Sequence, residues 1–185
     1  MQIILSSASM NSSNEHSIWK FSVIMMGDTK LNTESVGFIM NQSVYNVDYK
    51  QISVMYGLKH TLPKVSVYCG GPMMSERATI IHSNDYKIKG TQSFNKHSSL
   101  TFNDKIVKDI NAGKGPKEWK IMLGFSKWQD GQLDAEITRP GGWLIDTYDH
   151  TVWGNYRRKE KMWRRMIERN AKQQANHFLD TITQE

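Results

Sequence analysis

The sequence predicts a single α+β domain built around a mostly antiparallel, strongly curved sheet. Short β-rich segments separated by polar turns fill the first two-thirds of the chain. Two helical segments lie among them without a regular strand-helix-strand repeat, and one long amphipathic stripe ends the sequence. A chain of 185 residues, 38% hydrophobic and 23% charged, has the size and composition of one globular domain with its own core.

Seven segments rich in β-branched and other apolar residues are expected to form the strands. Each is short and bounded by polar turn residues, which is the pattern of strands joined by turns. They are Met1–Leu5, Lys20–Met26, Val36–Met40, Lys64–Cys69, Ala78–His82, Ser99–Phe102 and Glu118–Leu123.

Two helices are expected between these strands, over residues 47–59 and 103–113. Asn103 is a suitable N-cap for the second helix, and Gly113 is a suitable stop. The apolar positions of both helices are spaced to share one face: Tyr49, Ile52, Met55 and Tyr56 in the first, and Ile106, Val107 and Ile110 in the second.

The last part of the chain is expected to form one long amphipathic helix, over about residues 157–182. Its apolar residues recur every three or four positions and therefore share one stripe. They are Trp163, Met166, Ile167, Ala171, Ala175, Phe178, Leu179 and Ile182. We expect this stripe to dock on the body of the protein or on a partner.

The same helix carries the net charge of the protein. Residues 157–172 include eight basic and two acidic residues, which account for the formal charge of +6, and the rest of the chain is balanced. Clustered Arg and Lys are the electrostatic footprint of nucleic-acid binding. The candidate contacts are Arg157, Arg158, Lys161, Arg164, Arg165, Arg169 and Lys172. The other interpretations are a solvated or protein-contacting face and, disfavoured by the alanines of the stripe, an anionic membrane surface.

Several stretches of the sequence occur together in one known family. WKFSVIMM and VGFIMN come first, VYCGGPMMSERATIIH follows, and GKGPKEWKIMLGFSKWQDGQLDAEI and GGWLI come last. In this order they resemble the AlgH/YqgE family of small bacterial proteins over roughly residues 15–168. The resemblance implies a single domain over residues 1–185. Its bifurcated, mostly antiparallel sheet would fold into a pseudo-barrel with flanking helices.

The resemblance implies a binding or regulatory role more than a defined enzyme activity. Family members are labelled transcriptional regulators, although the sequence contains no standard DNA-reading motif. The chain departs from the family pattern at two places. Gln42 and Ser43 stand where an Arg-Pro pair usually follows Asn41, and Lys127 and Gln129 stand where glycines usually flank the tryptophan.

Six residues of these motifs are candidates for a ligand site: Asn41, Gly70, Gly71, His82, Gln132 and Glu136. Two glycines before a proline suit an unusual turn, and they can also expose amides to an anion. His82 ends a strand, where it is either a hydrogen-bonded structural residue or part of the site.

The stretch Leu123–Ile137 has two interpretations. In the first it is a structural joint, in which Gly124 ends a strand, Asp130 caps a short helix and Trp128 enters the core. In the second, the polar side chains of the short helix bind a ligand. The joint is favoured, because buried polar groups must be hydrogen-bonded in any case.

Cysteine and histidine usage argues against several kinds of chemistry. The single cysteine, Cys69, cannot form an internal disulfide, which suits a reducing cytoplasm, and no partnered base is evident for it. None of the six histidines stands in a metal-ligand spacing, and no phosphate-binding loop is present, so we expect no metal and no cofactor. No apolar run approaches a membrane span, and the N-terminus lacks the basic flank of a signal peptide.

These observations predict a cytoplasmic, non-enzymatic binding or regulatory protein that contacts nucleic acid through its basic C-terminal helix. One alternative is a small-ligand-binding or hydrolase-like enzyme that uses the Gly-Gly-Pro and Gly-Gln-Leu motif residues. Another is a module that binds a protein partner. No residue is singled out as catalytic, and the oligomeric state is left open.

Overall fold

The structure of the protein, a computed structural model, describes residues 3–7, 17–28, 34–45, 49–55, 66–156 and 158–182. The strands are β1 (Ile3–Ser6), β2 (Val23–Met26), β3 (Ser35–Ile39), β4 (Ser43–Val44), β5 (Val67–Cys69), β6 (Met73–Ser83), β7 (Thr91–Asn95), β8 (Ser98–Thr101), β9 (Trp119–Trp128) and β10 (Trp143–Asp146). The helices are α2 (Tyr49–Met55), α3 (Lys105–Asn111), α4 (Gln132–Thr138), the short 3₁₀ helix η1 (His150–Trp153) and α5 (Lys159–Ile182).

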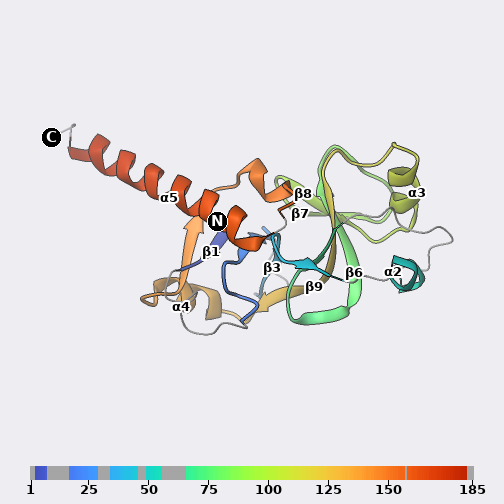
Figure 1. Ribbon diagram of the computed structural model, residues 1–185, viewed down its shortest axis with the longest axis horizontal. Coiled ribbons are helices and arrows are strands. Elements are labelled where there is room, and N and C mark those ends of the chain that lie inside the picture. Colours follow the sequence, from blue (N-terminus) through green and yellow to red (C-terminus); the bar gives the residue numbers. More distant parts are fainter. Residues whose placement is uncertain are drawn as a thin grey trace.

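Strand β9 divides the sheet into two leaves. Its second half, from Ser126 to Trp128, pairs with β3 in a leaf of order β10-β1-β2-β3-β9. Its first half, from Trp119 to Leu123, pairs with β6 in a leaf that continues to β8 and β7, and also pairs in parallel with β5. Every other pairing among the described strands is antiparallel. Figure 1 shows the leaves on either side of β9. The predicted α+β class with a bifurcated, curled, mostly antiparallel sheet is therefore confirmed.

Strands β1 and β2 of the first leaf are buried on both faces. In β1, Ile3 and Leu5 enter a core covered by η1 and the first half of α5, whereas Ile4 enters a separate core covered by α4. Met162 and Met166 are the buried residues of α5 in the first of these cores. Because side chains alternate along a strand, a strand covered on both faces reads as a continuous apolar run. This is why β1 and β2 could be recognised in the sequence.

The second leaf packs against α2 and α3. Ile52 of α2 and the pair Ile106 and Val107 of α3 lie in one core with residues of β5, β6 and β9. The N-cap of α3 is Asp104, one residue after the predicted Asn103, and its side chain makes no capping bond. Asn103 still contributes at this end, because its Oδ1 accepts a hydrogen bond from the Lys105 amide at 3.0 Å. The side chains of Tyr49, Met55 and Tyr56, also predicted for the face of the first helix, lie outside the described residues.

Three strands were not among those expected: β4, β7 and β10. The sequence of β7, Thr91–Asn95, is mostly polar, and its pairing with β8 makes it a strand. Asn95 also donates a hydrogen bond from Nδ2 to the Met26 carbonyl at 2.8 Å, which connects β7 to β2. Such cross-strand bonds leave no periodic signal in the sequence.

Gly124 does not end a strand, as the sequence suggested, but lies inside β9. Its φ is +68°, and its backbone packs directly against two other glycines, Gly70 and Gly71. A Cβ added at Gly70 would lie 2.3 Å from the Gly124 carbonyl oxygen, and one added at Gly124 would lie 2.6 Å from the Gly71 oxygen. We call these three residues the glycine crossing. Only glycine allows the backbones to approach this closely where β9 passes from one leaf to the other.

We predict that Gly124→Ala destabilises the protein much more than Gly113→Ala. The two glycines have nearly the same φ, +68° and +69°, but a Cβ at Gly113 would meet nothing within 4 Å. Gly113→Ala should therefore lose only about 1–2 kcal/mol, for the left-handed backbone alone. Gly124→Ala should lose about 3–5 kcal/mol, because it adds a backbone clash. Urea unfolding of both variants checks this, and equal losses would contradict the steric role of the crossing.

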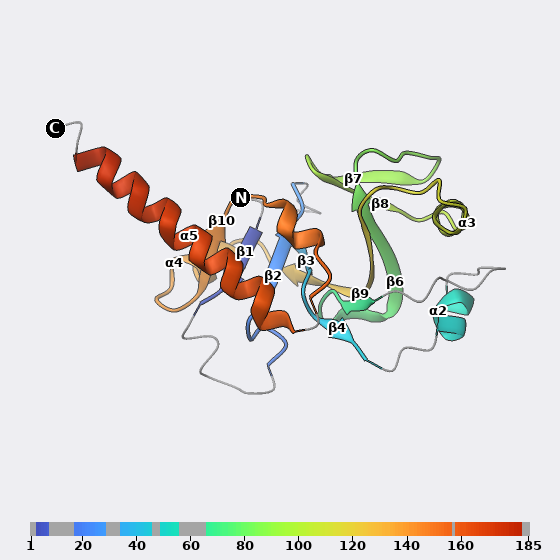
Figure 2. The same ribbon diagram turned by 45° about the horizontal axis from the view of Figure 1, so that its top comes forward.

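Helix α5 has the predicted extent, but only its first half lies on the body. Met162, Met166 and Asn170 are buried, whereas residues 171–182 are exposed throughout. Figures 1 and 2 show this second half projecting beyond the first leaf. The docked half is fastened at its end by Arg169, whose guanidinium pairs with Asp146 and Asp149. The predicted docking of the whole stripe on the body is thus limited to its first part.

A buried lysine fastens the segment that leads into α5. Lys120 is 3% exposed, and its Nζ donates hydrogen bonds to the carbonyl oxygens of Met40, at 2.7 Å, and Gly154, at 3.0 Å. The ammonium also lies 4.1 Å from the centre of the Tyr68 ring. Burial lowers the pKa of Lys120 to about 7, although Glu118 opposes this shift. The cation is therefore costly to hold in the folded protein.

We predict that stability rises with pH from about 7 to about 9 and that Lys120→Met flattens this rise. In this window the unfolded chain holds a proton at Lys120 that the folded protein has released, so folding is favoured as the pH increases. The difference in slope should be on the order of 1 kcal/mol per pH unit. Denaturant unfolding across the series measures it. An unchanged slope in the variant would show that Lys120 titrates normally.

Candidate nucleic-acid interface

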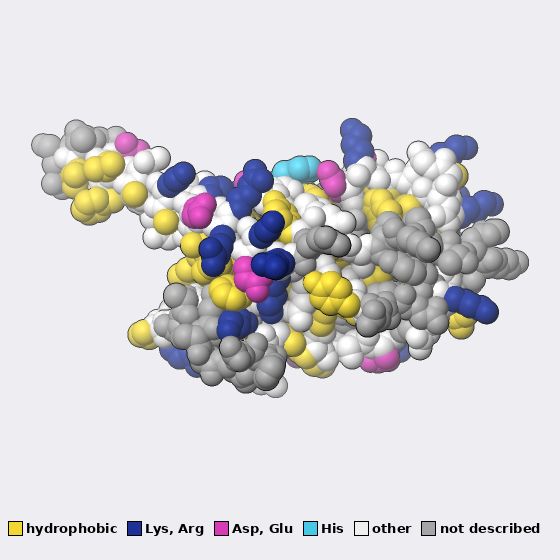
Figure 3. Space-filling model, viewed as in Figure 1, with side chains coloured by type: hydrophobic (Ala, Val, Ile, Leu, Met, Phe, Trp, Pro, Cys, Tyr) yellow, Lys and Arg dark blue, Asp and Glu magenta, His cyan; other side chains and the backbone are white. Residues whose placement is uncertain are grey.

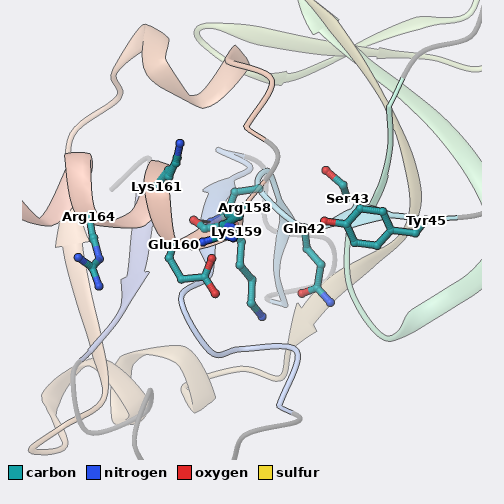
Figure 4. Close-up of a pocket in the computed structure, with 9 residues that line it drawn as sticks. Gln42, Ser43, Tyr45, Arg158, Lys159, Glu160, Lys161 and Arg164 are labelled. Carbon is teal, nitrogen blue, oxygen red and sulfur yellow. Dashed lines mark hydrogen bonds between the residues drawn. The ribbon is translucent and has the colours of Figure 1, made fainter.

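A groove of about 780 Å³ lies between the turn that joins β3 to β4 and the start of α5 (Figure 4). Its walls bring together parts of the chain that are more than 100 residues apart in sequence. It is lined by Asn41, Gln42, Ser43, Tyr45, Arg158, Lys159, Glu160, Lys161 and Arg164. Figure 4 shows Gln42, Ser43 and Tyr45 on one side and the α5 residues on the other.

The α5 side of the groove is strongly cationic. Arg158, Lys161 and Arg164 are exposed, and their side chains have no ion pair or hydrogen bond within the described part of the chain. Glu160 is the one carboxylate among the described residues of the lining. Burial lowers the pKa of the half-buried Lys159, an effect that Glu160 opposes. Figure 3 shows the Lys and Arg side chains gathered over this part of α5. Such unneutralised charge attracts anions.

The opposite wall is polar and aromatic. Tyr45 is 74% exposed at the rim. The Gln42 Oε1 atom is buried and has no hydrogen-bond partner in the described structure. Asn41 is different, because both ends of its amide are hydrogen-bonded within the protein. Its Oδ1 accepts from the Val23 amide, and its Nδ2 donates to the carbonyls of Phe21 and Lys159. Asn41 therefore holds the start of α5 against β2 and shapes the groove from behind.

The other predicted ligand residues lie apart from the groove and bond within the protein. His82 is fully buried between the Ser83 carbonyl and the Thr101 hydroxyl, each 2.8 Å from a ring nitrogen. Burial lowers the pKa of His82, so the ring is a neutral structural group. The Gly70 amide donates to Leu123, and its carbonyl accepts from Ile39 and from the Ser126 hydroxyl. These backbone groups are not directed at an anion.

Glu136 and Gln132 form the joint that the sequence favoured. Glu136 Oε2 accepts hydrogen bonds from the indole nitrogens of Trp128, at 3.0 Å, and Trp143, at 2.8 Å. Its Oε1 accepts from Gln132 Nε2 at 2.9 Å. The Gln132 Oε1 in turn accepts from the Gln129 amide. Asp130 was expected to be the N-cap of α4, but it is not. Helix α4 is preceded by Gly131 at φ +72°, without a side-chain cap.

The predicted basic contacts do not all lie at the groove. Arg158, Lys161 and Arg164 line the groove, and Arg165 lines a smaller hollow beside η1. Lys172 lies on the exposed second half of α5. Arg169 is held in its two ion pairs and serves the fold, and Arg157 lies outside the described residues. Arg169 therefore does not belong to the candidate interface.

Sequence reasoning missed Gln42, Ser43 and Tyr45 as groove residues. The available signal was that Gln42 and Ser43 depart from the family pattern directly after Asn41. The described residues contain no group of three His, Cys, Asp or Glu side chains placed to hold a metal ion. Among the helices that the structure describes, none combines the length and apolar character needed to cross a membrane.

We predict that Glu136→Ala loses about 2–4 kcal/mol of stability, because it leaves the indole N–H groups of Trp128 and Trp143 unpaired in the core. Glu136→Gln keeps a carbonyl acceptor and should lose about half as much. Chemical denaturation followed by tryptophan fluorescence measures both. A change within experimental error for Glu136→Ala would remove the structural role and reopen Glu136 as a ligand residue.

The AlgH-like family model matches residues 4–175. A UPF0301 protein of Gluconobacter oxydans is 29% identical over 136 residues, 72% of each chain. A UPF0301 protein of Rickettsia massiliae is 33% identical over 112 residues, 60% of this chain and 59% of the relative, which is less than two thirds of that protein's length.

Two solved structures share the fold. The solution structure of the AlgH protein from Pseudomonas aeruginosa has a TM-score of 0.67 at 19% identity and covers 87% of this chain and 83% of that one. The crystal structure of protein DIP2367 from Corynebacterium diphtheriae has a TM-score of 0.56 at 14% identity, over 82% of this chain and 78% of that one. From the extent of the family match, we conclude that the chain belongs to the AlgH-like family.

Proposed function

We propose that the protein is a non-enzymatic binding protein that holds the phosphates of a nucleic acid along the start of α5. The observation that carries this proposal is the cluster at the groove of exposed cations that have no partner among the described residues: Arg158, Lys161 and Arg164. Arg165 extends the cluster beyond the groove. Phosphate contacts from such side chains supply most non-specific affinity for nucleic acids.

The distribution of charge supports this assignment. Outside residues 157–172 the chain is balanced in charge, so an anionic polymer would be drawn to this one region. Tyr45 at the rim of the groove presents an exposed aromatic ring on which a base can stack.

We propose weak sequence selectivity. The docked face of α5 uses Met162, Met166 and Asn170, so the cationic first half of the helix lies along the surface and is not presented to a major groove. A regulatory role would then depend on where the protein is delivered rather than on base reading. We also propose a cytoplasmic location, which the lone half-buried thiol of Cys69 supports.

The side chains proposed for the enzyme alternative do not come together in the described structure. His82 lies in the second leaf between β6 and β8, whereas Gln132 and Glu136 lie on α4 beside the first leaf, and all three are bonded internally. No nucleophile and base among them share a cavity.

We predict that the triple variant Arg158→Gln, Arg164→Gln and Arg165→Gln loses most affinity for nucleic acid. If each side chain meets one phosphate, the slope of log affinity against log salt should shrink by about three. Fluorescence anisotropy with labelled single-stranded and duplex oligonucleotides across a salt series measures this. The fold should survive, because these side chains have no partners within the described part of the chain.

The matched control is Lys87→Gln, Lys89→Gln and Lys114→Gln. It removes the same charge from exposed lysines at the α3 end of the molecule. The control should keep its affinity within about twofold. Absence of binding by the native protein at low salt would overturn the proposal. Equal losses in the two variants would reduce the effect to net charge without a site.

A further inference from the structure

We propose that the exposed second half of α5 pairs antiparallel with the same segment of a second copy of the chain. Residues 171–182 form just over three turns of helix with exposed side chains, and Phe178 and Ile182 are 65% and 51% exposed. Figure 3 shows the hydrophobic group at the end of the projecting helix. Exposed apolar side chains that gather in one place mark a surface for a partner.

The apolar stripe of this segment lies beyond the protein's own body. At 3.6 residues per turn, Ala171, Ala175, Phe178 and Ile182 lie within about 60° of one another around the helix axis. Ile167 of the docked half packs against the first core and lies about 20° from Phe178 around that axis. The stripe is uncovered within the described structure because the second half of α5 projects beyond the first leaf (Figures 1 and 2).

The stripe is complementary to itself in one direction only. When two copies run antiparallel, Ala171 lies opposite Ile182 of the second copy, and Ala175 lies opposite Phe178 of the second copy. Each large side chain then meets a small one, which is the arrangement that close helix packing favours. A parallel pair would place Phe178 against Phe178 and leave the alanines facing each other across a gap.

Charge selects the same arrangement. Residues 171–182 carry only Lys172 and Asp180 as charged residues and are neutral in sum. In the cationic first half of α5, Arg164 lies on the same side of the helix as the stripe. A parallel pair would bring the Arg164 and Arg165 side chains of both copies together, whereas an antiparallel pair holds them at opposite ends. The partner that fits is therefore a second copy in the antiparallel direction.

The contact is short, so the association should be weak. Twelve helical residues span about 18 Å, and their pairing buries less than the roughly 1,200 Å² of a standard interface. We expect half-association at roughly tens of micromolar. Sedimentation velocity of the full chain, from low micromolar to several hundred micromolar, should show a monomer that converts to a dimer.

Two matched variants place the contact. Phe178→Glu with Ile182→Glu puts two negative charges in the stripe, and Gln173→Glu with His177→Glu puts two on the opposite side of the same exposed helix. Glutamate preserves helix propensity in both. The first variant should weaken dimerisation at least about tenfold, and the second should leave it within about twofold. Circular dichroism verifies that both remain folded.

Cross-linking tests the direction. In a Cys69→Ser background, chains with Ala175→Cys are mixed with chains with Phe178→Cys and oxidised. Antiparallel pairing predicts that the mixed disulfide dominates over either homodimer. A native chain that stays monomeric at every concentration overturns the proposal, as does a dimer that the stripe variant leaves intact. Dominance of the two homodimeric disulfides overturns the antiparallel direction.

Discussion

The close approach of three glycines at the centre of the sheet is the constraint on which the rest of the fold depends. Strand β9 belongs to both leaves because Gly124 takes a left-handed conformation there and packs on Gly70 and Gly71. On one side of this point β9 supports β3, and with it β2 and β1. On the other side it supports β5 and β6. The groove and the surface on which α5 docks are both built on these strands, so both depend on the glycine crossing.

The helix and its groove are assembled by a small number of polar contacts. Asn41 bonds the first carbonyl of α5, Lys120 holds the segment that precedes it, and Arg169 fastens the end of the docked half. Three separate parts of the chain thus position one helix. The cations at its start, Arg158, Lys161 and Arg164, have no such partner within the described structure, and their charge is left for the groove.

The sequence predicted what depends on local pattern and missed what depends on distant contacts. The apolar runs of β1 and β2 and the period of α5 were readable, because alternating or helical burial leaves a regular trace. The continuation of β9 past Gly124 was not readable, because a glycine that ends a strand and a glycine pressed against another backbone look the same. The joint was predicted in kind, but the bonds from Glu136 to two indole groups were not, because they join residues seven and eight positions apart across a turn. The groove arises only when Gln42 and Tyr45 meet α5 in space.

Burial of both faces of β1 and β2 has a consequence for how these two strands find their alignment. In most sheets a slip by one residue turns apolar side chains toward water, and this penalty sets the register. In β1 and β2 every position is apolar or small, so a slip by one residue would still place apolar side chains on both faces. Alignment must then come from the ends of the strands. There the Ser6 amide bonds the Ser22 carbonyl, and the Asn41 side chain receives the Val23 amide.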